Sequence, residues 1–335
     1  MVSVSQAVRL LIGEQNPQLV GDTAVTGLRL SFERAQWLPI SPPELYAELR
    51  AFLLRVEAQL EKGQGFKPQE GARLLRQLLH YPSHYLTELH MLTMRPRGEV
   101  DSFASHSLHV AINAFLLARA LGMTERQQME TALAGLFHEL GMIRLPAALR
   151  GKADELSGEE VRQIQSHPAI GSAIVSGFGE PWHNIALIIL QEHERLDGSG
   201  YPFGIRDSAI LPGASVVGVV DYYEALVNNR PYRSRLTPAE AAIHLLKNGK
   251  QQFPAEVIKE FLNLFSIYPV NSHVRLNNGA VCQVTRTNPA APLKPVVRLV
   301  EDGQGKPASG GGRLIDLSRT PLLHIAEILG ERHGS

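Results

Sequence analysis

The sequence predicts a mainly helical protein that ends in a small β-module. Apolar residues recur at helical spacing through most of the chain before Tyr268-Pro269, and helix-capping patterns precede several of these segments. After Tyr268-Pro269, apolar and polar residues alternate between turn signals. We therefore expect an N-terminal helical regulatory region (1–97), a helical domain (98–266) and a small C-terminal β-module (267–335).

The first region is expected to contain three helices. The motif Ser41-Pro42-Pro43-Glu44 supplies an N-cap, a proline in the first turn and a glutamate three residues after the cap. Apolar residues then recur at helical spacing from Leu45 to Leu60, and further helices are expected over 69–79 and 85–94. This region is expected to sense a signal, to form dimers or to support packing.

The second region contains helix signals of the same kind. Apolar stripes run over 108–116 and 133–140, and the second stripe is closed by Gly141. A helix is expected to end or bend at His167-Pro168. Capping boxes begin at Thr124 and Ser157, and residues 197–204 are rich in glycine and cannot form a helix interior. This region is therefore expected to be all-α with one structured loop.

The C-terminal region is expected to form strands. Val274 and Leu276 alternate with polar residues, Asn278-Gly279 is a hairpin signal, and 281–284 continues the alternation. Further strands are expected over 296–300 and 314–317. Cys282 is expected to be a small buried residue.

Composition excludes several classes of function. The chain has 33 basic and 33 acidic residues, which argues against a dedicated DNA-binding or anionic-membrane surface. One cysteine rules out an intrachain disulfide and a cysteine-based zinc site. No apolar stretch approaches the roughly 18–20 residues of a membrane helix, and the N-terminus does not resemble a secretory signal. We expect a soluble, cytoplasmic protein without membrane insertion.

The chain contains 13 histidines, and some of them stand beside carboxylates at the ends of apolar segments. Charge next to buried surface is costly unless it is paired or metal-bound, and imidazole and carboxylate both bind first-row metals. His80, His84 and His90 lack acidic partners at ligand spacing, so we expect ordinary surface or hydrogen-bonded residues there. The residues that combine these features are His106, His138, Glu139, His167, Glu192, His193 and Asp221.

Over roughly 98–264, the sequence resembles the HD-GYP family of the HD phosphohydrolase superfamily. The motifs that carry the resemblance are His106-Ser107, His138-Glu139-Leu140-Gly141, His167-Pro168, Glu192-His193-Glu194-Arg195-Leu196-Asp197-Gly198-Ser199-Gly200-Tyr201-Pro202, Val220-Asp221-Tyr222-Tyr223-Glu224-Ala225-Leu226 and Arg230-Pro231-Tyr232-Arg233. The order and spacing of these motifs make the match specific.

The resemblance implies a helical bundle that holds two or three divalent metal ions, usually iron or manganese, and hydrolyses cyclic di-GMP or related cyclic dinucleotides to linear products. It assigns the seven residues above as metal ligands, with His138 and Glu139 as catalytic residues. A protein partner could dock on the Gly-Tyr-Pro loop, and the chain could form a homodimer. The residues implied for substrate binding are Gly200, Tyr201, Pro202, Glu224, Arg230 and Arg233.

The chain departs from the family pattern at four positions. Glu139 stands where the family has aspartate, Glu192 where it has histidine, Met142 where it has lysine, and Glu224 where it has aspartate. The changes at Glu139 and Glu192 keep a side chain that can bind metal. Glu139 is a longer carboxylate of unchanged charge, whereas Glu192 replaces an imidazole, adds negative charge and would raise the pKa of a bound water. Loss of a cation at Met142 would cost about 10²–10³ in rate if that cation stabilises the transition state.

Three readings are therefore open at the sequence level. The first is a metal-dependent cyclic-dinucleotide phosphodiesterase. The second is a catalytically degenerate relative that binds cyclic di-GMP or a partner protein without turnover, and the third is a phosphohydrolase that acts on another nucleotide or phosphate ester.

Overall fold

The computed structural model describes residues 39–93, 103–152, 154–228, 236, 238–265, 268, 272–288, 291 and 293–329. The helices that it describes are α2 (Pro42–Glu61), α3 (Pro68–Leu75), α4 (Ser83–Thr93), α5 (Phe103–Ala120), α6 (Glu125–Phe137), α7 (Leu140–Ile143), α8 (Ala147–Arg150), α9 (Gly158–Ile164), α10 (His167–Ser176), α11 (His183–Gln191), α12 (Pro212–Val227), α13 (Pro238–Asn248) and α14 (Ala255–Leu264). The mainly helical fold class is confirmed.

The described part of the chain divides into two compact units. The first contains α2 to α12 with residues 250–257, and the second contains residues 236–249 together with 258–329. Helices α2 to α4 thus belong to the same compact unit as α5 to α12. The domain limits and the regulatory role of region 1–97 stay predictions.

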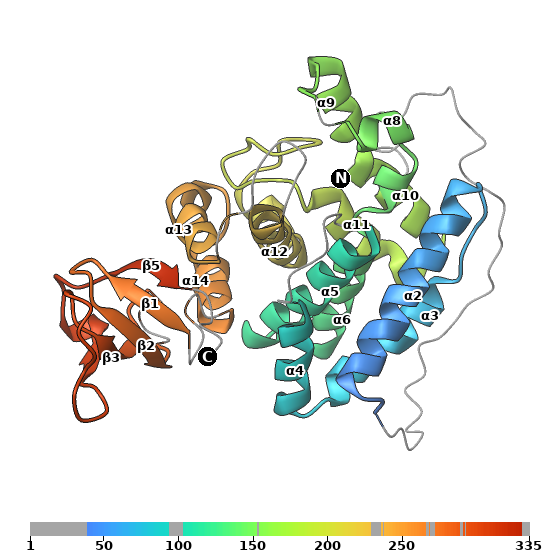
Figure 1. The fold of residues 1–335 in the computed structure, drawn as a ribbon. Coiled ribbons are helices and arrows are strands. Elements are labelled where there is room, and N and C mark those ends of the chain that lie inside the picture. Colours follow the sequence, from blue (N-terminus) through green and yellow to red (C-terminus); the bar gives the residue numbers. More distant parts are fainter. Residues whose placement is uncertain are drawn as a thin grey trace. The chain divides into compact units, whose positions relative to one another are not determined.

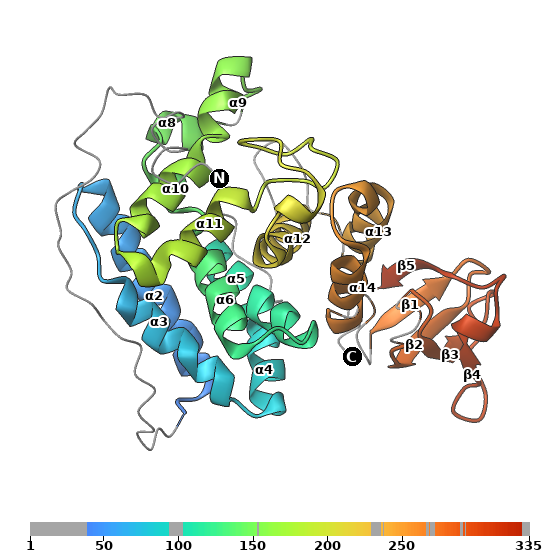
Figure 2. The ribbon, with the colours of Figure 1, turned by 180° about the vertical axis from the view of Figure 1, so that it is seen from behind.

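Helix α5 forms the centre of the first unit. Every residue from Ser107 to Ala118 is buried, and α2, α4, α6 and α12 all pack against this helix (Figure 1). A helix that is buried on all sides must be surrounded by other elements that remove its surface from water. Helix α10 packs beside α7. Helix α11 packs on α10, α6 and α12 (Figure 2).

An aromatic cluster fastens the N-terminal helices to this bundle. The ring of Phe66 lies 6.4 Å from that of Phe52, 5.7 Å from that of Phe137 and 5.1 Å from that of Phe178. Trp182 packs against Phe137 and Phe178 at 6.1 and 5.9 Å. Aromatic pairs in edge-on and similar tilted arrangements add about 0.5–1.5 kcal/mol each beyond simple burial.

The capping patterns act at the expected places. Ser41 begins α2 with a complete capping box, and the Thr124 side chain accepts a hydrogen bond from the backbone of Gln127 at the start of α6. At His167-Pro168 the chain changes helix: α9 ends at Ile164, and Pro168 lies in the first turn of α10. The absent proline N–H is harmless there, because N–H groups in a first turn have no partner within the helix.

The second unit contains an antiparallel sheet in the order β4-β3-β2-β1-β5. Gly279, at a φ of +86°, lies in the β1–β2 turn, which confirms the expected hairpin, and Cys282 is buried opposite Val274. Strand β5 was not predicted. The strands are β1 (His273–Leu276), β2 (Val281–Arg286), β3 (Val296–Glu301), β4 (Leu314–Asp316) and β5 (Ile325–Leu329).

No helix of the described residues is both long enough and apolar enough to cross a membrane.

Candidate metal centre

The four histidines and three acidic residues singled out from the sequence lie on α5, α10, α12 and at the ends of α6 and α11. His106 is in the first turn of α5, His138 and Glu139 join α6 to α7, and His167 is the first residue of α10. Glu192 and His193 follow α11, and Asp221 lies inside α12. The fold therefore brings together residues that are up to 115 positions apart, counted from His106 to Asp221.

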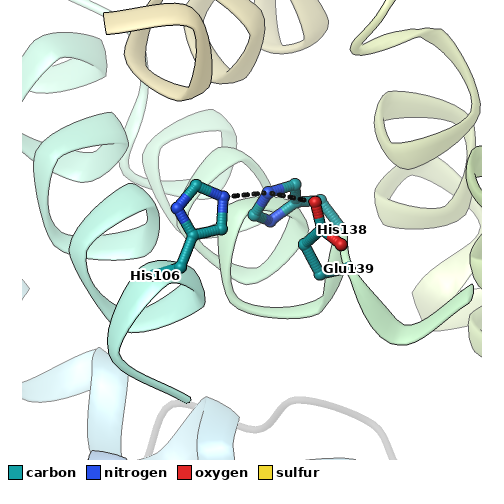
Figure 3. A group of neighbouring side chains, drawn as sticks. All are labelled: His106, His138 and Glu139. Carbon is teal, nitrogen blue, oxygen red and sulfur yellow. Dashed lines mark hydrogen bonds and ion pairs between the residues drawn. The ribbon is translucent and has the colours of Figure 1, made fainter. Parts of the chain in front are cut away.

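The first group of ligand atoms belongs to His106, His138 and Glu139, whose side chains point toward one another (Figure 3). The Nε2 atoms of the two histidines are 3.3 Å apart, and Glu139 Oε1 is 3.9 Å from His138 Nε2. Asp221 joins this group, because its Oδ1 is 3.0 Å from His106 Nε2 and 3.8 Å from His138 Nε2.

The second group consists of His167, Glu192 and His193. The two histidine Nε2 atoms are 3.2 Å apart, and Glu192 Oε1 lies 3.7 Å from the first and 3.6 Å from the second. The ligand atoms of His106, His138 and Glu139 all lie within 4.8 Å of one another, and so do those of His167, Glu192 and His193. One cation in each group could therefore reach several donors.

Backbone carbonyls orient two of these imidazoles. His138 Nδ1 lies 2.9 Å from the carbonyl oxygen of Gly135, and His167 Nδ1 lies 2.8 Å from that of Ile164. In each ring, Nδ1 can donate its proton to the carbonyl, which leaves Nε2 directed at the neighbouring ligand atoms. Metal-ligating histidines usually make this kind of hydrogen bond through their other ring nitrogen.

The electrostatics favour positive charge between the groups. Burial alone would lower the pKa of His138, but Glu192, Asp221 and Glu139 outweigh it and raise the pKa to about 10. Burial opposes the shift at His167 as well, yet Glu192 and Glu139 raise its pKa. The two groups are thus close enough for carboxylates of each to act on a histidine of the other.

The pKa values of His193 and Asp221 depend on the same balance between burial and neighbouring charge. Burial, together with the neighbouring His167, lowers the pKa of His193 to about 4, although Glu192 opposes this, so His193 is neutral. Burial would raise the pKa of Asp221, but hydrogen bonds to His106 and His138 hold it well below its usual range. Divalent metals bind neutral imidazoles and ionised carboxylates. His193 and Asp221 have these protonation states, whereas His138 would lose its proton when a metal binds.

Glu192 provides the sharpest test of whether a metal fits. The residue is 1% exposed, and neither carboxylate oxygen has a hydrogen-bond partner. Burial would raise the pKa of this group, but His193, His138 and His167 lower it, so it is ionised. An ionised carboxylate without hydrogen bonds is expensive to bury. The donor set and this unsatisfied carboxylate both fit divalent cations.

Three glycines let backbone segments approach the ligands closely. A Cβ atom at Gly141 would overlap the carbonyl oxygen of His167, and one at Gly200 would overlap that of His193. A Cβ at Gly218 would lie 2.5 Å from the carbonyl oxygen of Glu192. Each glycine therefore seats a neighbouring helix or loop directly against the backbone of a candidate ligand.

The Gly-rich loop folds back over the second group. Glu194 is 3% exposed, and its carboxylate accepts hydrogen bonds from the backbone N–H groups of Phe203 at 2.7 Å and Ile205 at 2.9 Å. Tyr201 is thereby placed with its ring stacked on His193, with centroids 4.6 Å apart and planes at 24°. Burial raises the pKa of Tyr201, so its hydroxyl stays protonated.

Arg195 is the buried cation next to this loop. Its guanidinium donates hydrogen bonds to the carbonyl oxygens of Glu192 and Glu194, each at 2.9 Å, and lies 4.5 Å from the ring centroid of Phe253. Burial lowers the pKa of Arg195, while Asp221 and Glu192 oppose that effect. The side chain clamps the backbone that carries two candidate ligands.

The other predicted site residues have different surroundings. Met142 is partly buried in α7. Glu224 is 3% exposed and contacts residues of α5, as described below. Arg230 and Arg233 lie outside the described residues.

Sequence reasoning assigned no role to Glu194 or Arg195, although both lie inside the quoted Glu192–Pro202 motif. Two charged residues just before a Gly-rich loop were the available signal, because such a loop needs partners for its backbone N–H groups. His109 and Asn113 were missed because they lie within an apolar stripe and have no charged neighbours in sequence.

Comparison with known proteins supports the motif resemblance. A family model described as "HD domain" matches residues 91–257, and one described as "KOW domain associated with HD domain" matches residues 273–333. A cyclic di-GMP phosphodiesterase of Pseudomonas aeruginosa is 30% identical over 201 residues, which cover 60% of this chain and 48% of the relative. This chain belongs to the HD-GYP family.

One further curated relative and one solved structure also match this chain. The cyclic di-GMP phosphodiesterase response regulator RpfG of Xanthomonas campestris is 30% identical over 251 residues, covering 73% of this chain and 65% of that protein. The solved structure of an HDG"Y"P protein from Bdellovibrio bacteriovorus shares the fold, with a TM-score of 0.52 and 20% identity over 66% of this chain and 70% of that chain. The chain thus spans about half the length of the Pseudomonas aeruginosa relative and about two thirds of the length of RpfG.

Proposed function

We propose that this HD-GYP chain is a metal-dependent phosphodiesterase that hydrolyses cyclic di-GMP, or a related cyclic dinucleotide, to linear pGpG or GMP. The observation that carries this proposal is the buried Glu192 carboxylate, which faces two histidines and lacks hydrogen-bond partners. Such a group is explained by a cation that shares the centre with it. Iron and manganese suit the mixed imidazole and carboxylate donors.

The proposed ligand sets follow the two groups of side chains. His106, His138, Glu139 and Asp221 would hold one ion, and His167, Glu192 and His193 would hold another. Counting the metals per chain would show whether a third ion binds. Bound divalent ions supply Lewis-acid activation of the phosphodiester and of the attacking water. Glu192 of the second group raises the pKa of His138, and Glu139 of the first group raises the pKa of His167. We propose that His138 and Glu139, which couple the two groups in this way, are the catalytic residues.

The chain's own contribution to substrate binding would come from the loop after the second group. Tyr201 is fixed against His193 and offers a protonated hydroxyl, while Gly200 and Pro202 shape the loop on either side of it. Arg230 and Arg233 would hold phosphate or guanine edges, which the forked guanidinium geometry suits. A protein partner on this loop, a homodimer and a cytoplasmic location stay predictions.

A specific observation favours a second candidate function, which is binding of cyclic di-GMP without turnover. Met142 supplies no positive charge, whereas the family has lysine there, and Glu192 adds negative charge to the centre where the family has histidine. A more anionic centre would weaken the activation of water. The two functions differ in whether product forms once metal and nucleotide are bound.

The deciding experiment is to load the purified chain with Mn²⁺ or Fe²⁺, to count the metals per chain, and to follow cyclic di-GMP by chromatography. Turnover above that of a His138→Ala control is expected for the phosphodiesterase. Bound metal and nucleotide without turnover would leave the binding function. The double variant Met142→Lys with Glu192→His should raise the rate if the wild type is an impaired enzyme.

A further inference from the structure

Helices α5 and α12 are joined at two consecutive levels. At the metal centre, His106 Nε2 and Asp221 Oδ1 lie 3.0 Å apart. One turn further along each helix, His109 Nδ1 lies 3.8 Å from Glu224 Oε2, and Asn113 donates to Glu224 Oε1 at 3.4 Å. Because residues three apart in a helix share a face, the second level continues the first.

The second level is closed to solvent. The exposed fractions are 1% for His109, 3% for Asn113 and 3% for Glu224. A carboxylate at this depth requires partners, and Glu224 also receives a hydrogen bond from Asn228 Nδ2 at 3.0 Å. A buried polar network with several fixed partners resists alternative packing arrangements, so it holds α5 and α12 in one relative position.

The N-terminal helices are attached to the same level. Tyr46 of α2 places its hydroxyl 2.6 Å from His109 Nε2. From α4, His90 Nδ1 lies 3.1 Å from Asn113 Oδ1, and the Thr93 hydroxyl donates to the same oxygen at 3.3 Å. His109 and Asn113 thus contact the N-terminal helices on one side and Glu224 on the other.

We propose that Tyr46, His90, His109, Asn113 and Glu224 form a positioning cluster that sets the spacing between His106 and Asp221. Metal affinity then depends on how α2 and α4 are seated, although none of the five residues is a proposed ligand. The inference rests on the proposed function in one respect, which is that His106 and Asp221 share a metal ion. It also gives Glu224 a positioning role in place of the substrate contact expected from the motif.

The test is Tyr46→Phe in the full chain, which removes one hydroxyl remote from every proposed ligand. We expect Mn²⁺ binding to the folded, metal-free protein to weaken about three- to tenfold by calorimetry, as the loss of one hydrogen bond from a positioning network would give. The paramagnetic resonance spectrum of the bound Mn²⁺ should change as well, because the ligand geometry relaxes. Tyr85→Phe is the matched control, since Tyr85 meets Tyr81 and His84 through its ring.

Glu224→Gln provides a second variant, which removes the charge facing His109 and should weaken Mn²⁺ binding in the same direction. Unchanged affinity and spectrum in both variants, or an equal loss in the Tyr85→Phe control, would overturn the positioning cluster. A fall in thermal stability without any change in Mn²⁺ affinity would also overturn it, because the cluster would then serve stability alone. Absence of Mn²⁺ binding by the wild type would instead refute the metal centre itself, and the positioning role with it.

Discussion

At the scale of single residues, the candidate centre depends on where negative charge is buried. Glu192 occupies a fully enclosed position next to His167 and His193, and its ionised state is stabilised by the two histidines whose pKa values are raised, His138 and His167. Glu139 is less buried, and its charge acts on histidines of both groups. The centre therefore combines one enclosed carboxylate with one that lies nearer to solvent.

Gly218 gives a residue-scale prediction about the packing that holds Glu192. In Gly218→Ala, the new methyl group would lie 2.5 Å from the Glu192 carbonyl oxygen, so α12 and the segment after α11 must separate. Forcing an extra methyl into a packed contact costs about 2 kcal/mol, which urea unfolding would measure.

Gly65→Ala is the control for that measurement, because a methyl group there meets no atom within 4 Å. Equal stability of the two alanine variants would show that the contact between α12 and the Glu192 backbone has more room than the structure indicates.

At the scale of elements, the loop over 197–206 is held by side chains that precede it or lie within it. Glu194 fixes the far side of the loop through two backbone N–H groups, and Asp197 accepts hydrogen bonds from the backbone and hydroxyl of Ser199 at 2.9 and 2.6 Å. The stacked position of Tyr201 on His193 depends on this closure. The loop is therefore a built part of the centre.

Removing the Glu194 carboxylate should open the loop. In Glu194→Ala, the N–H groups of Phe203 and Ile205 lose their acceptor, and a loss of about 1.4 kcal/mol in closure would raise the rate of proteolysis within the loop about tenfold. Limited digestion followed by mass spectrometry would locate the cuts. Glu155→Ala, at an exposed position outside the loop, should digest like the wild type, and so should Glu194→Ala if the carboxylate has no role in closure.

At the scale of the whole molecule, one compact unit contains both the N-terminal helices and every proposed ligand. The aromatic cluster around Phe66 and the polar cluster around His109 both link α2 to the bundle. Metal binding to this unit should therefore stabilise α2 and α4 together with the ligand-bearing helices, because they pack as one body.

Metal addition gives the corresponding prediction. A ligand at 100 times its Kd stabilises the folded state by about 2.7 kcal/mol, which for a unit of this size raises Tm by roughly 5–10 °C. Calorimetric melting with and without Mn²⁺ would measure the shift, and a chelator should reverse it. His193→Gln should reduce the shift while His183→Gln, at an exposed position on α11, should keep it; an equal shift in both would place the ion elsewhere.

Local signals in the sequence were sufficient for most of the helices. The capping boxes at Ser41, Thr124 and Ser157 and the hairpin at Gly279 lie where expected, because each depends on residues a few positions apart. Strand β5 was missed, since its partner β1 lies about 50 residues earlier and provides its hydrogen bonds. Pairing over that distance leaves no local signal.

Residue types and motif spacing alone were enough to identify the family, the mainly helical fold and the seven candidate ligands. Only the tertiary structure could divide those ligands into two groups, leave Glu192 without hydrogen-bond partners and connect Tyr46 and His90 to the helices that carry His106 and Asp221. The physical reason is that a motif specifies chemistry along the chain, whereas distance, burial and charge coupling depend on how α5, α12 and the N-terminal helices pack.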